Sequence, residues 1–92
     1  MSQERPNILF LMADQFRTRT LTGMGDGIEP PNIDRIRSMG CFFPQASCAS
    51  PLCVPSRAAL TTGRYPHRCG VLHDYDNLAV DQDTYYRRLR DV

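Results

Sequence analysis

The segment CVPSRAALTTGR at residues 53–64 constrains the fold and the chemistry of this chain more than any other. Pro55 suits the first turn of a helix, because its fixed φ matches the helix and its missing N–H has no partner to lose there. Gly63 suits the left-handed position that ends a helix. The pattern therefore predicts a helix that begins at Cys53 and ends before Gly63.

A cysteine at a helix entrance lies beside unpaired backbone N–H groups and the positive end of the helix dipole, which favour an anion. Arg57 follows Cys53 by about one helical turn on the same side, and its guanidinium is a permanently charged, planar donor. A nucleophile, an anion site and an arginine thus fall within one short segment. Together they indicate a site that attacks a sulfate or phosphate ester.

The letters Cys-x-Pro-Ser-Arg at residues 53–57, with Thr-Gly-Arg at 62–64, closely resemble the signature of the formylglycine-dependent sulfatases. Two positions depart mildly from it. Val54 is bulkier than the usual small residue, and Thr61 stands where the family usually has an aliphatic one. The segment GRYPH at residues 63–67 resembles the same family.

The resemblance implies the α/β fold of the alkaline phosphatase-like superfamily, in which helices flank a mostly parallel sheet. It covers residues 5–67 strongly and the remainder loosely. Later family segments, including one with a lysine and a histidine, have no counterpart here, and the chain contains no lysine. We therefore expect residues 1–92 to form the N-terminal part of a sulfatase catalytic domain, and the chain alone to be inactive.

The continuous apolar run at residues 7–12 is typical of a strand buried on both faces of a parallel sheet. Asp14 then falls just past the carboxyl end of that strand, where open α/β sheets bind their ligands. Taken alone, Asp14 is more simply a turn residue or a helix cap. A second short strand is predicted at residues 41–43.

In the resembled family, a strand of this kind ends in an Asp-Asp pair that binds a divalent cation. Asp14 matches the first member of the pair, and Gln15 replaces the second with an uncharged amide oxygen that can still bind a hard cation. The resemblance thus implies a metal site that includes Asp14, Gln15 and Cys53, with Ca²⁺ favoured over Mn²⁺ or Mg²⁺. Choline-sulfatase-like and phosphonate monoester hydrolase-like relatives also carry Asp-Gln here.

The resemblance further implies that a formylglycine-generating enzyme oxidises Cys53 to an aldehyde, whose hydrate attacks the sulfur of a small-molecule sulfate ester. Arg57 would stabilise the developing anion, and Arg64 would brace the site. Cys53 and Arg57 are therefore the predicted catalytic residues of a sulfuric ester hydrolase. Hydrolysis of phosphonate monoesters or phosphodiesters by the same formylglycine is the alternative within the superfamily.

Two further interpretations come from other classes of protein. A small zinc-binding module would use Cys48, Cys53, Cys69 and His73, although neither spacing is the usual Cys-x2-Cys. The simpler interpretation makes Cys41, Cys48 and Cys69 small buried residues. An ordinary cysteine hydrolase would use Cys53 with a histidine.

Other elements are predicted from local signals. Residues 31–40 are expected to form a packing helix, because proline begins the segment, glycine ends it and apolar residues share one face. Residues 16–29 are expected to form a surface loop and residues 64–71 a turn-rich connection. A last helix is expected over residues 84–92, with Asp83 or Thr84 as its cap. His67 and His73 are expected at structural or surface positions.

The composition excludes some functions. A net charge of +1 gives no broad basic surface for nucleic acid or an anionic membrane. The longest apolar run, residues 8–13, is far shorter than the roughly 20 residues that a membrane-spanning helix needs. No apolar stretch typical of a signal peptide follows the first residues. A cytoplasmic location is therefore the default expectation.

Overall fold

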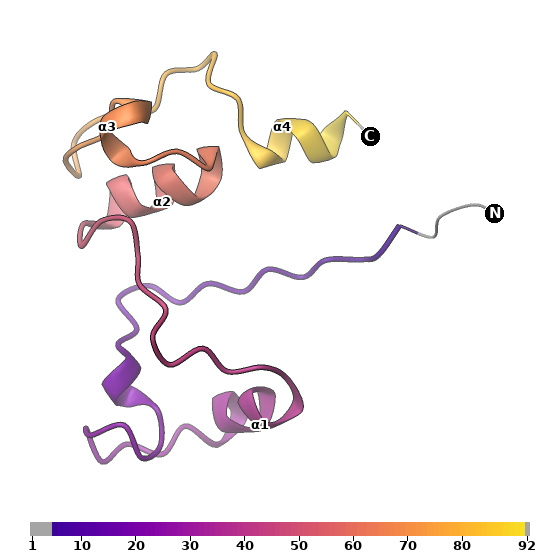
Figure 1. Ribbon diagram of the computed structural model, residues 1–92, viewed down its shortest axis with the longest axis vertical. Coiled ribbons are helices and arrows are strands. Elements are labelled where there is room, and N and C mark those ends of the chain that lie inside the picture. The colour runs from indigo at the N-terminus through magenta and orange to yellow at the C-terminus, as the bar shows by residue number, and fades with distance from the viewer. Residues whose placement is uncertain (1–4, 92) are drawn as a thin grey trace. The chain divides into compact units, whose positions relative to one another are not determined.

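The computed structural model describes residues 5–91, which divide into two compact units, one that ends at Met39 and one that begins at Gly40. The first contains the short 3-10 helix η1 (Thr18–Thr20) and helix α1 (Pro31–Met39), as Figure 1 shows. The second contains α2 (Cys53–Thr62), α3 (Pro66–Cys69) and α4 (Tyr85–Arg90).

No β-strand forms among residues 5–91, so the two predicted strands and the parallel sheet are not observed. Residues 7–12 are extended but exposed; Leu9, for example, is 82% exposed. The predicted strand at residues 41–43 is likewise irregular. The physical reason is that a strand satisfies its backbone N–H and C=O groups only by pairing with another strand, and the described residues offer it none.

The loop that leads from Asp14 to α1 is tied by ion pairs around one carboxylate. Asp26 lies 3.0 Å from the guanidinium of Arg17 and 3.3 Å from that of Arg19, and its N–H donates to the carbonyl of Arg19 at 3.0 Å. Leu21, within this loop, is buried. The predicted surface loop therefore contains a defined turn, and the short helix η1 within it was not predicted.

Helix α1 confirms the helix predicted from Pro31 and Gly40, and it ends at Met39. The hydroxyl of Thr22 donates to the carboxylate of Asp34 in its first turn. The expected packing face is not buried in this unit, because Met39 remains 71% exposed. Local signals thus set the helix without supplying its packing partner.

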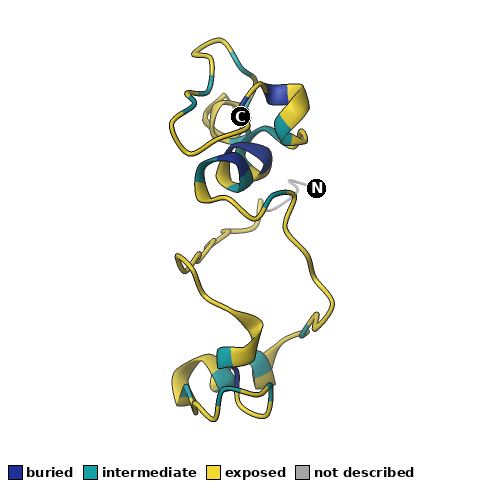
Figure 2. Ribbon diagram, turned by 90° about the vertical axis from the view of Figure 1, so that its left-hand side faces the viewer, coloured by how far each residue is buried: buried dark blue, intermediate teal, exposed yellow. Residues whose placement is uncertain are grey.

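The second unit is built on α2. Ala58 packs with Cys69 and with Val71, which is completely buried, and the partly buried Val54 and Leu78 complete this small core. Buried residues appear dark blue in Figure 2. The packing places one face of α2 against the segment that follows it and leaves the opposite face exposed.

Helix α2 ends as the sequence predicted. Gly63 has a φ of 68°, in the left-handed region, and its N–H donates to the carbonyl of Ala59 at 2.8 Å. The hydroxyl of Thr62 donates to the carbonyl of Ala58 at 2.8 Å. The glycine reverses the chain, so that the next residues run back beside the helix.

Helix α3 was not predicted, whereas the start of α4 was. The short helix α3 begins at Pro66 and ends at Cys69, and the capping Gly70 has a φ of 77°, which is again left-handed. Thr84 caps α4 by accepting a hydrogen bond from the N–H of Arg87 at 3.4 Å, which confirms the predicted start.

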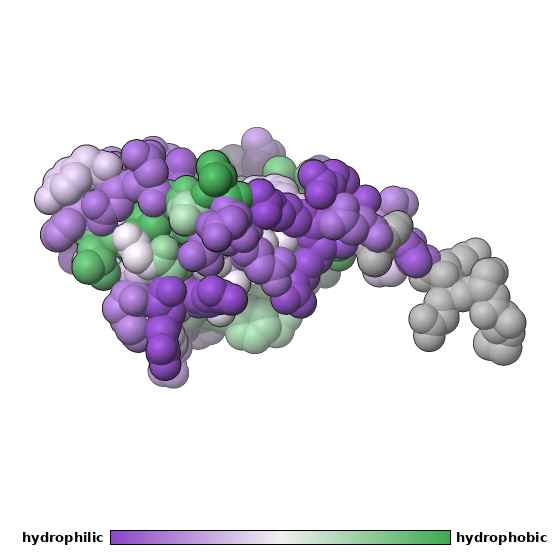
Figure 3. All heavy atoms as spheres, turned by 90° about the horizontal axis from the view of Figure 1, so that it is seen from above, coloured by the Kyte–Doolittle hydropathy of each residue, from purple (hydrophilic) through white to green (hydrophobic). Residues whose placement is uncertain are grey.

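Apolar surface remains on both units. Figure 3 shows hydrophobic atoms in green among the hydrophilic atoms in purple on one face of the molecule. The exposed apolar residues include Leu9, Met39 and Val80. Within residues 5–91, no helix combines the length and apolar character that a membrane crossing requires.

Candidate active site

Cys53 is the first residue of α2 and is exposed. The first turn of a helix normally leaves several N–H groups without intrahelical partners. Here Pro55 has no N–H, and the N–H of Ser56 donates to the carbonyl of Leu52 at 3.0 Å. The N–H groups of Cys53 and Val54 are therefore the two at this entrance that lie outside the ladder of helical bonds.

One of these two donors is taken by a carboxylate from outside the helix. The N–H of Val54 donates to Oδ1 of Asp74 at 2.9 Å. The predicted anion position at the start of α2 is thus filled from within the chain. This contact was not predicted, because Asp74 is one of several acidic residues in an irregular stretch and lies far from Val54 in sequence.

The loop that carries Asp74 is held by a second carboxylate. Oδ2 of Asp76 accepts the N–H of Leu72 at 2.7 Å and that of His73 at 2.8 Å. These backbone hydrogen bonds, with the charge of His73 as a smaller cause, hold the pKa of Asp76 below its ordinary value. The ring of His73 also stacks on Tyr75, with 5.2 Å between the ring centroids.

Arg57 follows Cys53 at the i+4 position of α2 and is exposed, as Cys53 is. Residues four apart lie on the same face of a helix, so Cys53 and Arg57 share one face of α2. Leu60, at i+7, continues this face and is 46% exposed. The face opposite the buried Ala58 therefore carries the candidate catalytic groups.

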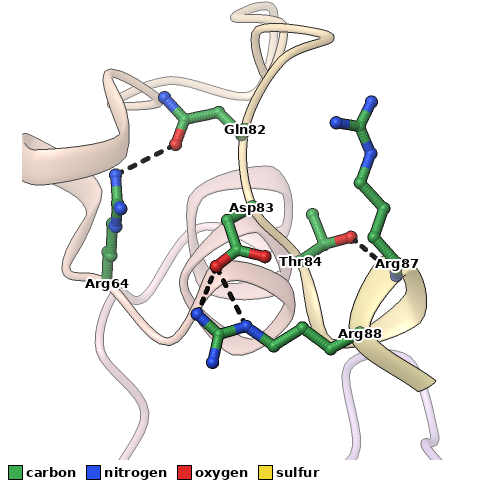
Figure 4. A network of polar contacts seen from close by, with 6 residues as sticks. All are labelled: Arg64, Gln82, Asp83, Thr84, Arg87 and Arg88. Atoms are coloured by element: carbon green, nitrogen blue, oxygen red, sulfur yellow. Dashed lines mark hydrogen bonds and ion pairs between the residues drawn. The ribbon is translucent and has the colours of Figure 1, made fainter. Parts of the chain in front are cut away.

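Arg64 lies just past the end of α2 in a polar network that reaches α4, drawn in Figure 4. Its Nη1 donates to Oε1 of Gln82 at 3.3 Å. Next to Gln82, Asp83 accepts two hydrogen bonds from Arg88, the one from Nε at 2.9 Å. These bonds hold the pKa of Asp83 below its ordinary value. The network agrees with the bracing role that the resemblance implied for Arg64.

A surface hollow of about 550 Å³ is lined by residues of α2, including Ser56 and Leu60, and by residues 63–65 just after the helix. Residues 47–49 also line it. Cys53 is not among the lining residues, although Ser56 lies less than one turn from it. The hollow therefore lies beside the candidate nucleophile and not around it.

The predicted metal ligands fall in both units. Asp14 and Gln15 form a turn in the first unit, and Cys53 lies in the second. Gln15 has a φ of 53°, a left-handed conformation that residues other than glycine seldom adopt. The carboxylate and amide oxygens suit a hard cation such as Ca²⁺, which takes about 6–8 oxygen ligands. Within residues 5–91, no group of three or more His, Cys, Asp or Glu side chains is arranged to hold a metal ion.

The proposed zinc ligands are not brought together. Cys48 and Cys53 are exposed, whereas Cys69 is buried in the core, and His73 is stacked on Tyr75. The expectation that Cys41, Cys48 and Cys69 are buried is right only for Cys69. Burial at the other two positions would require a covering element, which the sequence around them does not specify.

The sequence profile of the sulfatase family matches residues 6–89, nearly the whole chain. The chain belongs to the sulfatase family. Membership in that family implies the α/β fold of the alkaline phosphatase-like type.

Sulfatases of several kinds are similar to this chain. It is 45% identical to human arylsulfatase H over 78% of its own length, and 49% identical to human steryl-sulfatase over 73%. It is 34% identical to N-acetylglucosamine-6-O-sulfatase of Bacteroides thetaiotaomicron over 95% of its length. The chain spans only 13%, 12% and 16% of these three relatives, respectively. No solved structure matches it.

Proposed function

We propose that this sulfatase segment is the N-terminal part of a catalytic domain that hydrolyses small-molecule sulfate esters. The nucleophile is a formylglycine made from Cys53, and the site includes a divalent cation, Ca²⁺ by preference. One observation carries the proposal: within a segment that matches the sulfatase family, Cys53 is exposed at the first position of α2 and Arg57 follows it on the same face.

The exposure of Cys53 suits both stages of its use. A modifying enzyme must reach the thiol, and a substrate must reach the group that replaces it. Formylglycine supplies an aldehyde hydrate, whose hydroxyl is a nucleophile at sulfur and whose collapse to the aldehyde releases sulfate. A thiol or a serine hydroxyl lacks the second hydroxyl that this release requires.

The residues of this chain then hold the substrate and its charge. Arg57 binds the oxygens of the ester through its planar guanidinium, whose forked donors match the geometry of such an anion. The N–H at the entrance of α2 and the helix dipole favour the same negative charge. Arg64, held through Gln82 and the α4 region, keeps the end of α2 in place.

Asp14 and Gln15 would hold the cation through one carboxylate oxygen and one amide oxygen, and Cys53 in its converted form would join them. When bound, the cation lowers the pKa of the attacking hydroxyl and neutralises charge on the ester oxygens. We propose further that residues 7–12 form a buried strand of the parallel sheet in the complete domain. The apolar run and the position of Asp14 directly after it support this.

The test uses the full-length enzyme, produced together with a formylglycine-generating enzyme. We expect hydrolysis of 4-nitrophenyl sulfate, loss of that activity in Cys53→Ser, and a tryptic peptide whose mass shows conversion of Cys53. Cys48→Ser is the matched control, because Cys48 is also an exposed thiol close in sequence. It should retain activity.

Three results would redirect the proposal. Preferential hydrolysis of a phosphonate monoester or phosphodiester would assign the second activity of the superfamily. Full activity of a protein whose Cys53 remains entirely a thiol would favour an ordinary cysteine hydrolase. Stoichiometric zinc in place of turnover would favour the binding module.

A further inference from the structure

Helix α2 lacks a cap from its own flanking residue. Leu52 stands at the N-cap position with extended φ and ψ values of −95° and 145°, and its side chain makes no capping hydrogen bond. Ser, Thr, Asp and Asn are the residues that usually provide one. The cap comes instead from Asp74, whose carboxylate accepts the N–H of Val54 at 2.9 Å.

The hydrogen-bonded N–H belongs to the peptide group that joins Cys53 to Val54. Because a peptide group is planar and rigid, a bond to this N–H fixes the orientation of the backbone on one side of Cys53. The contact therefore restrains the residue that carries the nucleophile, although Asp74 is bonded to its neighbour.

Asp74 is held firmly enough to impose that restraint. Val71, three residues earlier, is completely buried against Ala58 of α2. The carboxylate of Asp76 bonds to the N–H groups of Leu72 and His73, and the N–H of Asp76 donates to the carbonyl of His73 at 3.1 Å. Asp74 thus sits in a tight turn whose start is anchored in the core of the same unit.

We propose that Asp74 is a positioning residue for the reaction at Cys53. It caps α2 through the Cys53–Val54 peptide and so fixes the nucleophile relative to Arg57, one turn along the helix. A negative group near the positive end of the helix dipole adds to the stability of this arrangement. Because the N–H of Val54 donates to Asp74, the ester anion is bound by Arg57 and by the N–H of Cys53. The inference rests on the proposed function.

The experiment compares Asp74→Ala and Asp74→Asn in the full-length enzyme, with Asp81→Ala as the control. Asp81 is an exposed carboxylate of the same unit. Hydrogen exchange by mass spectrometry, on peptides that span residues 52–60, reports the cap without reference to activity. We expect exchange at the start of α2 to accelerate about fivefold in Asp74→Ala, as for loss of a typical helix cap. Asp74→Asn keeps an acceptor oxygen and should exchange more slowly than Asp74→Ala.

Activity is measured as kcat and KM for 4-nitrophenyl sulfate, with kcat expressed per formylglycine determined by mass spectrometry. We expect kcat of Asp74→Ala to fall by about tenfold or more, since small displacements of a reacting group are costly, with KM changed much less. Asp74→Asn should recover part of kcat, and Asp81→Ala should match the wild type in both measurements.

The outcomes separate the two claims. Unchanged exchange at the start of α2 in Asp74→Ala would overturn the cap. Faster exchange with an unchanged kcat would overturn the positioning role. A wild-type enzyme without turnover on any sulfate ester would instead refute the proposed function, while the exchange measurement would still decide whether Asp74 caps α2.

Discussion

Candidate site residues come from two parts of the chain, the segment that leads to Asp14 and the helix that begins at Cys53. The two differ in how far their backbone and side chains are paired and packed. In α2, which begins at Cys53, the backbone N–H and C=O groups pair within the helix. One face of the helix packs on Val71, and Asp74 caps its start. Before Asp14, the run at residues 7–12 is extended and exposed, with Leu9 at 82%. The predicted nucleophile thus lies on a packed scaffold. The first predicted metal ligand instead follows a segment that is exposed and forms no strand with the other described residues.

The difference shows which elements can form from neighbouring residues. A helix pairs its N–H and C=O groups within one segment, so α2 needs only a small core to be stable. A central strand has both edges paired and both faces covered by other parts of a fold. Helix α2 therefore forms from neighbouring residues, whereas a strand at residues 7–12 would form only by pairing with other strands.

The largest change in the free energy of unfolding is expected at residues 7–12. If residues 7–12 are a buried strand in the full-length enzyme, Leu9→Ala should lower the free energy of unfolding by about 3 kcal/mol, as is typical when a buried leucine is truncated. Val80→Ala is the control, because Val80 is 89% exposed in the second unit. The measurement is denaturant unfolding of the full-length protein. A change below about 0.5 kcal/mol, as expected for a surface position, would contradict the strand.

The next effect tests the core beneath α2. Val71→Ala removes two methyl groups from a completely buried side chain that contacts Ala58, and should cost about 2 kcal/mol. Because Val71 anchors the turn that carries Asp74, the same variant should also speed hydrogen exchange at the start of α2. Stability that falls without faster exchange there would show that the core and the Asp74 cap are not coupled.

The predictions that succeeded rest on signals within one or two turns of chain. Pro31, Pro55, Gly63 and Thr84 mark helix ends through backbone geometry or side-chain capping, and each lies at the expected end of its helix. Helix α3 obeys the same rule, with Pro66 at its start and Gly70 at its end, but it is so short that its signals resemble those of a turn.

The features that were predicted wrongly or not at all depend on contacts between residues distant in sequence. The bond from Val54 to Asp74 exists because Val71 and Cys69 pack on Ala58 and bring the following turn to the entrance of α2. No local pattern around Asp74 distinguishes it from the other acidic residues nearby. The same holds for Cys41 and Cys48, which are exposed, and for residues 7–12, which form no strand. Whether such residues are buried or paired depends on contacts with segments distant in sequence.

A smaller effect is expected at the end of α2. Gly63→Ala should cost about 1 kcal/mol, because alanine pays a steric penalty at a φ of 68° while its added Cβ meets no atom within 4 Å. Asp81→Ala is the control, because Asp81 is exposed in the same unit. Thermal unfolding of the full-length protein gives the comparison. Equal effects of the two substitutions would mean that the left-handed turn does not form in the complete protein.

The smallest effect concerns the turn that carries Asp74, and it depends on pH. Backbone N–H groups lower the pKa of Asp76, so its folded-state pKa lies below its unfolded value. The stabilisation is therefore fully present above the unfolded pKa and is lost as the pH falls through the folded pKa. Asp76→Asn should melt below the wild type near neutral pH, and this difference should shrink as the solution is acidified below the ordinary carboxyl range.

Asp81→Asn serves as the control for removal of a charge from the same unit. A difference between wild type and Asp76→Asn that stays constant through the acid range would show that the charge of Asp76 does not hold this turn. The position of Asp74 would then depend on the packing of Val71 alone.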